Sequence, residues 1–122
     1  MKIKTQDLTG IQLDWAVAKC LNWKDYNEDG VPYIELDSSH MSRRFGPYKP
    51  STDWEHAGPI IDWQNIHWGF GTKDGNKVVI ASKLGHHVKP LLGPTPLIAA
   101  MRCYVDSILG NKIEIPEELI ET

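Results

Sequence analysis

The sequence is poor in the features that define several specialised protein classes. Two cysteines in 122 residues are too few for a disulfide framework, and a chain of this length buries a core without one, so we expect Cys20 and Cys103 to be free thiols. No stretch approaches the roughly 18 consecutive apolar residues of a membrane span. The residues after Met1 are too polar for a signal peptide, which needs an apolar stretch. We therefore expect a cytoplasmic protein without a membrane partner.

Positive charge is not in surplus either. Lysine and arginine total 13 against 16 aspartates and glutamates, which gives a formal net charge of −3. A protein that binds nucleic acid regardless of base sequence needs a basic surplus to displace counterions. The composition thus speaks against dedicated nucleic-acid binding, although it leaves room for a local basic patch.

Apolar periodicity predicts one folded domain over residues 1–122. Thr95 and Pro96 begin the clearest helix, because threonine is a good N-cap and proline suits the first helical position, and Gly110 ends it. Thr9 and Gln12 form the capping-box pattern of a second helix start. The predicted elements are strands at 1–5, 33–36 and 113–115, helices at 10–22 and 96–109, and a hairpin of 66–71 with 77–81 across Asp74-Gly75-Asn76.

These elements predict an α+β fold, in which a small, mostly antiparallel sheet packs against two main α-helices and long irregular loops connect them. Residues 39–50 are rich in serine, glycine, proline and basic residues, which is typical of a loop. Thr52 and Glu55 form a second capping box, which opens a short helix that Gly58 and Pro59 close. Pro59 is a candidate start for a further helical turn. Four tryptophans are expected in the core, namely Trp15, Trp54, Trp63 and Trp68.

One stretch combines groups that bind anions. Arg43, Arg44 and Lys49 lie in a segment without acidic residues that runs directly into a helix start. Guanidinium groups match phosphate oxygens, free amides at a helix start add donors, and an aromatic ring can stack on a base. The alternative is a solvated loop whose arginines pair with acids elsewhere. The candidate ligand-binding residues are Arg43, Arg44, Tyr48, Ser51, Thr52, Asp53, Trp54 and Thr95. A second candidate position is the start of the helix after Thr95, together with Arg102, although the prolines on either side of Thr95 remove two donors.

Other chemistry has little support in the sequence. Asp25 to Gly30 resembles the first half of a calcium loop, but the twelfth position is Leu36 where a glutamate is needed, so we interpret it as an acidic surface turn. The five histidines lack metal-ligand spacing, and we predict no metal and no cofactor. No acid, base and nucleophile set stands out, and Ser51 and Cys103 are better explained as structural residues, so no catalytic residue is assigned.

Three motifs identify a family by resemblance. They are Leu8-Thr9-Gly10 with Leu13-Asp14-Trp15-Ala16-Val17-Ala18, then Pro50-Ser51-Thr52-Asp53-Trp54 with Gly58-Pro59-Ile60-Ile61, and then Gly93-Pro94-Thr95-Pro96 running on to Val105. In this order they resemble the NinX family of lambdoid phages and prophages. The resemblance implies a phage accessory protein of uncharacterised role that acts in a bacterial cytoplasm. The Pro50 to Trp54 stretch is also similar to segments of small phage proteins that sequester nucleotide immune signals.

Two functions follow as hypotheses. The first is non-catalytic binding of a small anionic, nucleotide-like ligand, as in counter-defence sequestration. The alternative is a protein-interaction module that modifies host or phage replication or recombination machinery. We also expect a homodimer, because five tryptophans in a small domain leave aromatic surface that a partner copy can cover.

Overall fold

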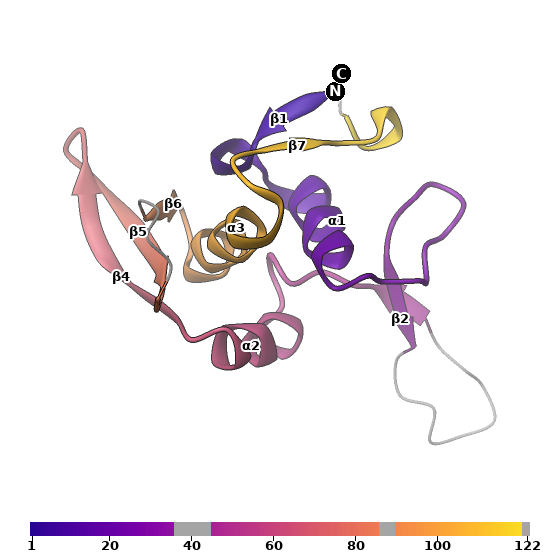
Figure 1. The fold of residues 1–122 in the computed structure, drawn as a ribbon, viewed down its shortest axis with the longest axis horizontal. Coiled ribbons are helices and arrows are strands. Elements are labelled where there is room, and N and C mark those ends of the chain that lie inside the picture. The colour runs from indigo at the N-terminus through magenta and orange to yellow at the C-terminus, as the bar shows by residue number, and fades with distance from the viewer. Residues whose placement is uncertain (36–44, 86–89, 121–122) are drawn as a thin grey trace.

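The computed structural model describes residues 1–35, 45–85 and 90–120, and it confirms the α+β class (Figure 1). In the described part of the chain, the strands form three small antiparallel sheets, which lie around three α-helices. The elements are β1 (Lys2–Lys4), η1 (Thr5–Asp7), α1 (Gly10–Cys20), β2 (Tyr33–Glu35), β3 (Phe45–Pro47), α2 (Trp54–Trp63), β4 (Ile66–Lys73), β5 (Asn76–Lys83), β6 (Leu91–Gly93), α3 (Pro96–Leu109), β7 (Lys112–Glu114) and η2 (Glu117–Leu119).

Helix α3 lies at the centre of the fold, with the β4–β5–β6 sheet on one side and α1 on the other (Figure 1). Its predicted limits are confirmed. The Thr95 hydroxyl accepts a hydrogen bond from the Ile98 amide at 3.2 Å, Pro96 occupies the first turn, and Gly110 follows the helix with a φ of 91°. Every residue from Ala99 to Val105 is buried, so this helix contributes to the core on several sides.

The predicted hairpin is also confirmed and is longer than expected. β4 and β5 pair over eight residues each, and Asp74 and Gly75 form the two-residue turn with φ of 53° and 81°. Two positive φ values match the twist of a tight hairpin, which explains the aspartate and glycine there. The sequence did not predict β6, which pairs with β5 and completes the three-stranded sheet, because three residues ending in glycine carry no strand signal of their own.

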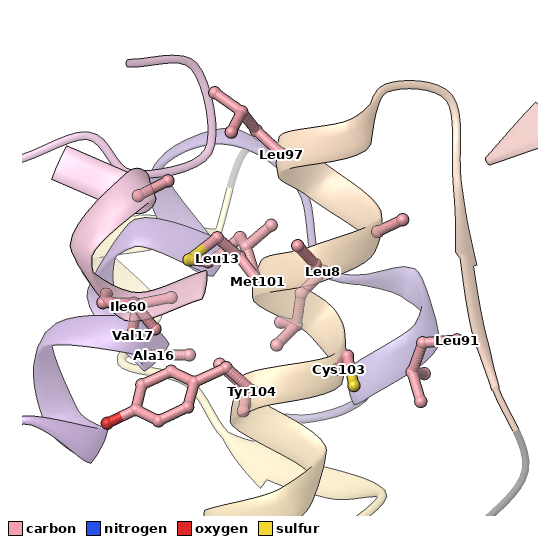
Figure 2. Packing of buried hydrophobic residues seen from close by; sticks show 14 of the residues in the cluster. Leu8, Leu13, Ala16, Val17, Ile60, Leu91, Leu97, Met101, Cys103 and Tyr104 are labelled. Atoms are coloured by element: carbon pink, nitrogen blue, oxygen red, sulfur yellow. The ribbon is translucent and has the colours of Figure 1, made fainter. Parts of the chain in front are cut away.

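Among the described residues, helix α1 packs mainly against α3, whereas the prediction placed it against the sheet. Leu13 and Val17 of α1 are fully buried, as is Met101 of α3 (Figure 2). The Thr9 capping bond is also absent: Thr9 is the N-cap residue but its side chain makes no cap hydrogen bond. Gln12 instead donates from Nε2 to the Leu119 carbonyl at 3.2 Å, and this bond ties α1 to the end of the described chain.

Two further expectations were wrong. Helix α2 is one helix with Pro59 inside it, because the buried side chain of Ile60 continues the packed face beyond the proline. Residues 45–47 belong to the predicted loop 39–50 but form the strand β3, because they pair antiparallel with β2.

Three of the four tryptophans expected in the core are exposed. Trp54 is 51%, Trp63 is 64% and Trp68 is 40% exposed. The space between the central elements is filled by aliphatic side chains and by alanines, which allow close approach but leave no room for indole rings; the fully buried alanines are Ala16, Ala18, Ala57, Ala81, Ala99 and Ala100. The fold therefore carries considerable aromatic surface.

Both cysteines are free, as predicted. Among the described residues, no helix has the length and apolarity that crossing a membrane requires.

Sheet and helix approach each other closely at Gly93, and this contact can be tested. A Cβ at this position would lie 2.7 Å from the Ala99 nitrogen and 3.0 Å from its Cα, both backbone atoms of α3. Gly93→Ala should therefore destabilise the protein by about 1–3 kcal/mol, measured by urea denaturation.

The matched control is Gly58→Ala, because a Cβ at Gly58 meets nothing within 4 Å. This substitution in α2 should leave stability unchanged or raise it by about 0.5–1 kcal/mol. Equal effects of the two substitutions would contradict the close contact between β6 and α3.

Candidate functional site

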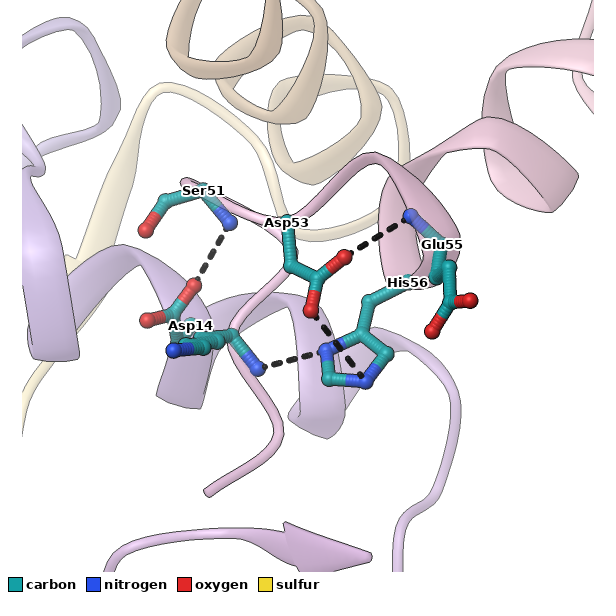
Figure 3. Close-up of polar contacts among 6 residues, drawn as sticks. Asp14, Ser51, Asp53, Glu55 and His56 are labelled. Carbon is teal, nitrogen blue, oxygen red and sulfur yellow. Dashed lines mark hydrogen bonds and ion pairs between the residues drawn. The ribbon is translucent and has the colours of Figure 1, made fainter. Parts of the chain in front are cut away.

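The start of α2 is the first place to look for a site, because most of the candidate residues surround it. Asp53 is the N-cap, and its Oδ1 accepts the Glu55 amide at 2.9 Å (Figure 3). The amides of His56 and Ala57 donate to the Asp53 carbonyl at 3.1 Å and 3.0 Å. The amides of Glu55, His56 and Ala57 are thus bonded within the chain, and the carboxylates of Asp53 and Glu55 add negative charge at this helix start.

Beneath this helix start lies a buried carboxyl group. Asp14 of α1 is 7% exposed, and its Oδ1 accepts the Ser51 amide at 2.8 Å (Figure 3). Burial raises the pKa of Asp14 from 3.8 to about 6, against the lowering effects of the Ser51 amide and the nearby charge of Lys49. The bond fixes the turn before α2 onto α1.

Tyr48 is held by aromatic contacts on two sides. It stacks on Trp23 with ring centroids 4.3 Å apart and an interplanar angle of 13°, and its centroid lies 5.1 Å from that of His56. Nδ1 of His56 accepts the Lys49 amide at 3.0 Å, and Nε2 faces Asp53 at 3.9 Å. The Tyr48 ring, 5% exposed, is therefore packed between Trp23, which follows α1, and His56 of α2.

The remaining candidate residues differ in exposure, and they do not all lie at the start of α2. Thr52 and Trp54 are exposed, whereas Ser51 is 2% exposed. Thr95 caps α3 and therefore belongs to a different helix start. Arg43 and Arg44 lie outside the described residues.

The second testable prediction concerns Asp14 and pH. Because its pKa is higher in the folded protein (about 6) than in the unfolded chain (3.8), the folded state binds more protons between these values. Stability attributable to this carboxyl therefore falls as pH rises from about 4 to about 6, by on the order of 2 kcal/mol. Asp14→Asn keeps an oxygen acceptor for the Ser51 amide and should remove this decline in urea denaturation at several pH values.

The exposed Asp62 supplies the control. Asp62→Asn should follow the wild-type dependence of stability on pH. A wild-type decline in the Asp14→Asn protein would mean that another group is responsible.

A second candidate site is a cavity of about 870 Å³ on the other side of α3. It lies between η1, the β4–β5 hairpin, β6 and the end of α3. Its volume falls in the range of small-molecule sites, roughly 300–1,000 Å³. The apolar lining residues are Ile80, Pro90, Leu91 and Leu92, and the polar ones are Lys4, Gln6, Asp7, Lys73, Asp106, Asn111 and Lys112.

Three lysines from separate elements meet at this cavity. Lys4 of β1 and Lys112 of β7 are direct cross-strand partners, an arrangement that places like charges opposite each other and is destabilising in itself. Lys73 at the end of β4 lines the same cavity. None of the three ammonium groups forms an ion pair with the described residues.

A buried arginine adds positive charge behind the cavity wall. Arg102 is 7% exposed, and its guanidinium donates to the Leu8 carbonyl at 2.9 Å and to the Leu92 carbonyl at 2.6 Å. Burial lowers the pKa of Arg102, while the charge of Asp7 opposes this shift. The cavity lining thus holds two acids, Asp7 and Asp106, against the three lysines, and the buried Arg102 lies behind them.

Sequence reasoning identified Arg102 as a second candidate but missed the lysines. Lys4, Lys73 and Lys112 are far apart in the chain, and no motif around any of them distinguishes it from an ordinary surface lysine. Only the pairing of β1 with β7 and the length of β4 bring them together.

The residues weighed for other chemistry have structural roles. Oδ1 of Asn27 accepts the amides of Asp29 and Val31, each at 2.9 Å, which forms the predicted surface turn. Burial raises the pKa of Cys103 to about 11, so its thiol stays protonated near neutral pH. No group of three or more potential metal ligands gathers within residues 1–35, 45–85 and 90–120.

Comparison with known proteins identifies a family. A family model described as "Bacteriophage P22, NinX" covers residues 4–107, most of the chain. No curated protein matches the chain.

Proposed function

We propose that this chain, which belongs to the NinX family of phage proteins, binds a small anionic, nucleotide-like ligand without catalysing a reaction on it. The ligand would occupy the cavity between η1, the hairpin, β6 and α3. Such a protein would act in the cytoplasm of a bacterial host, where sequestering a nucleotide signal serves a phage as a counter-defence.

The observation that carries this proposal is the set of unpaired lysines in the cavity. Lys4, Lys73 and Lys112 present three ammonium groups to one space of about 870 Å³. An anion between them would remove the repulsion of the Lys4 and Lys112 pair and gain charge-assisted hydrogen bonds. The buried Arg102 strengthens the positive potential from behind.

The apolar part of the lining indicates what the ligand has besides charge. Ile80, Leu91 and Leu92 supply a surface that phosphate oxygens do not fill. A ligand with a planar or apolar portion, such as a nucleobase, would bury it there, while its phosphates would reach the lysines. This division of the cavity favours a nucleotide over inorganic phosphate.

The third prediction is ligand binding itself. In a thermal-shift screen of nucleoside mono-, di- and triphosphates and cyclic dinucleotides, at least one should stabilise the protein, by about 2.7 kcal/mol at a hundredfold excess over its Kd. The Kd measured by calorimetry should rise with salt concentration, because exposed ammonium groups are screened. If no member of this panel stabilises the protein, the proposed ligand class is wrong.

The fourth prediction locates the site. Lys73→Ala with Lys112→Ala should weaken binding of the ligand found in that screen by about 10-fold or more per lysine, the usual effect of losing a hydrogen bond to a charged group. The fold should be unaffected, because both side chains are exposed and unpaired. Lys2→Ala with Lys24→Ala changes the net charge equally outside the cavity and should leave the affinity within about twofold.

The start of α2 remains the other proposed position for the ligand. The double substitution of Arg43→Ala with Arg44→Ala tests this position in the same assay. A substitution of Trp54, whose ring is 51% exposed, tests it as well. Loss of binding in the arginine variant with full binding in the lysine variant would move the site from the cavity to the start of α2. The reverse result would confirm the cavity.

The second candidate function is a protein-interaction module for host or phage replication or recombination machinery. It is favoured by the exposed aromatic side chains of Trp54, Trp68 and Phe70, since tryptophan and phenylalanine are enriched in protein interfaces. Absence of any nucleotide binding, together with a stable complex of the purified protein with one replication or recombination protein, would favour this function over the first.

A further inference from the structure

The two edges of the three-stranded sheet differ in how they are protected. At the β6 edge, the side-chain amide of Gln6 replaces a strand: Nε2 donates to the Leu92 carbonyl at 2.6 Å, and Oε1 accepts the Leu92 amide at 3.0 Å. At the opposite edge, β4 bonds only to β5, and no other described segment forms a hydrogen bond with its backbone. Within the part of the chain that the structure describes, the outer backbone groups of this eight-residue strand are thus open.

The sequence of β4 has none of the usual protection against pairing. Natural edge strands carry lysines, prolines or other charges, which prevent association with a second strand. Between Ile66 and Thr72 there is no lysine, arginine, aspartate, glutamate or proline, and His67 is the one ionisable residue. Lys73 stands only at the end of the strand.

Exposed aromatic rings accompany this open edge. Trp68 and Phe70 lie on the same face of β4, are 40% and 63% exposed, and meet edge to face with centroids 6.0 Å apart. Trp54 of α2 extends the row, with its centroid 6.2 Å from that of Trp68. An edge bordered by unburied aromatic rings gains both backbone hydrogen bonds and apolar burial when another strand joins it.

We propose that the strand that joins β4 is β4 of a second copy of this chain, paired antiparallel across a twofold axis at Gly69. This register places Trp68 of one copy opposite Phe70 of the other, twice, on one face of a continuous six-stranded sheet. It also places His67 opposite Gly71 and Ile66 opposite Thr72, so no like charges meet. A twofold axis requires a strand that is complementary to itself, and β4 meets this requirement.

The same register leaves the opposite face open at the axis. Gly69 would face its own counterpart there, and a Cβ at this position meets nothing within 4 Å in the single chain. Directly opposed residues of an antiparallel pair have Cα atoms about 4.5–5.5 Å apart, which is within disulfide range. Gly69→Cys should therefore crosslink two copies under mild oxidation.

The experiment measures the mass of the full chain by light scattering at micromolar concentration. The wild-type protein should have twice the 13.8 kDa of one chain. Phe70→Lys places a charge in the middle of the open edge and should halve the mass. Leu84→Lys, which changes an equally exposed apolar residue just beyond β5, should remain dimeric.

The crosslinking experiment with Gly69→Cys does not depend on whether Phe70→Lys affects folding. Gly69→Cys should give a disulfide-linked dimer on a non-reducing gel. Gly58→Cys, at a position equally open in the single chain, should give no more crosslinking than the wild-type protein with its two native cysteines. A monomeric wild-type mass overturns the proposal, as does a dimer that Phe70→Lys leaves intact and Gly69→Cys does not crosslink.

Discussion

The arrangement of the central layers depends on the buried guanidinium of Arg102. From the middle of α3 it bonds to the Leu8 carbonyl before α1 and to the Leu92 carbonyl in β6, and so joins three parts of the fold that are distant in sequence. A buried arginine is costly unless its donors are bonded. Because it bonds to uncharged backbone carbonyls, it fixes geometry and keeps its positive charge.

That arrangement explains why a cavity and a sheet edge occur where they do. Leu92 accepts a bond from Arg102 and exchanges two with Gln6, so β6 is bonded on both sides although it has only three residues. The sheet consequently ends at β6 with a side chain in place of a strand, and the cavity lies beside this end. At the other side, no described residue covers β4 in a similar way. The two edges of one small sheet thus have different proposed roles: the ligand site lies beside β6 and the dimer contact at β4.

The elements predicted correctly are those whose signals lie next to each other in the chain. Thr95, Pro96 and Gly110 delimit α3, and Asp74-Gly75 delimits the hairpin, through local backbone preferences. β3 and β6 escaped prediction because their sequences, Phe-Gly-Pro and Leu-Leu-Gly, lack the alternation of apolar and polar residues, so only their partner strands define them. The same reason applies to the site: the Asp14 bond to Ser51 and the meeting of Lys4 with Lys112 join residues that no spacing rule connects. Three tryptophans were wrongly expected in the core, because hydrophobicity predicts burial but does not show how much room the closely packed, alanine-rich helices leave between them.

The pairing of β1 with β7 joins the beginning of the chain to residues more than a hundred positions away, since the Met1 amino group meets Glu114 at a separation of 113 residues. Closing so long a loop costs conformational entropy, and the two strands that it joins have only three residues each. This β1–β7 pair, the terminal clasp, should therefore form late in folding. It should also be among the first parts of the native protein to open. Lys4 and Lys112 belong to the clasp and oppose its closure by their repulsion. A polyanion bound between them would reverse that repulsion. Occupancy of the cavity would then slow exchange of the amide hydrogens in both terminal strands and couple ligand binding to the kinetic lifetime of the closed chain.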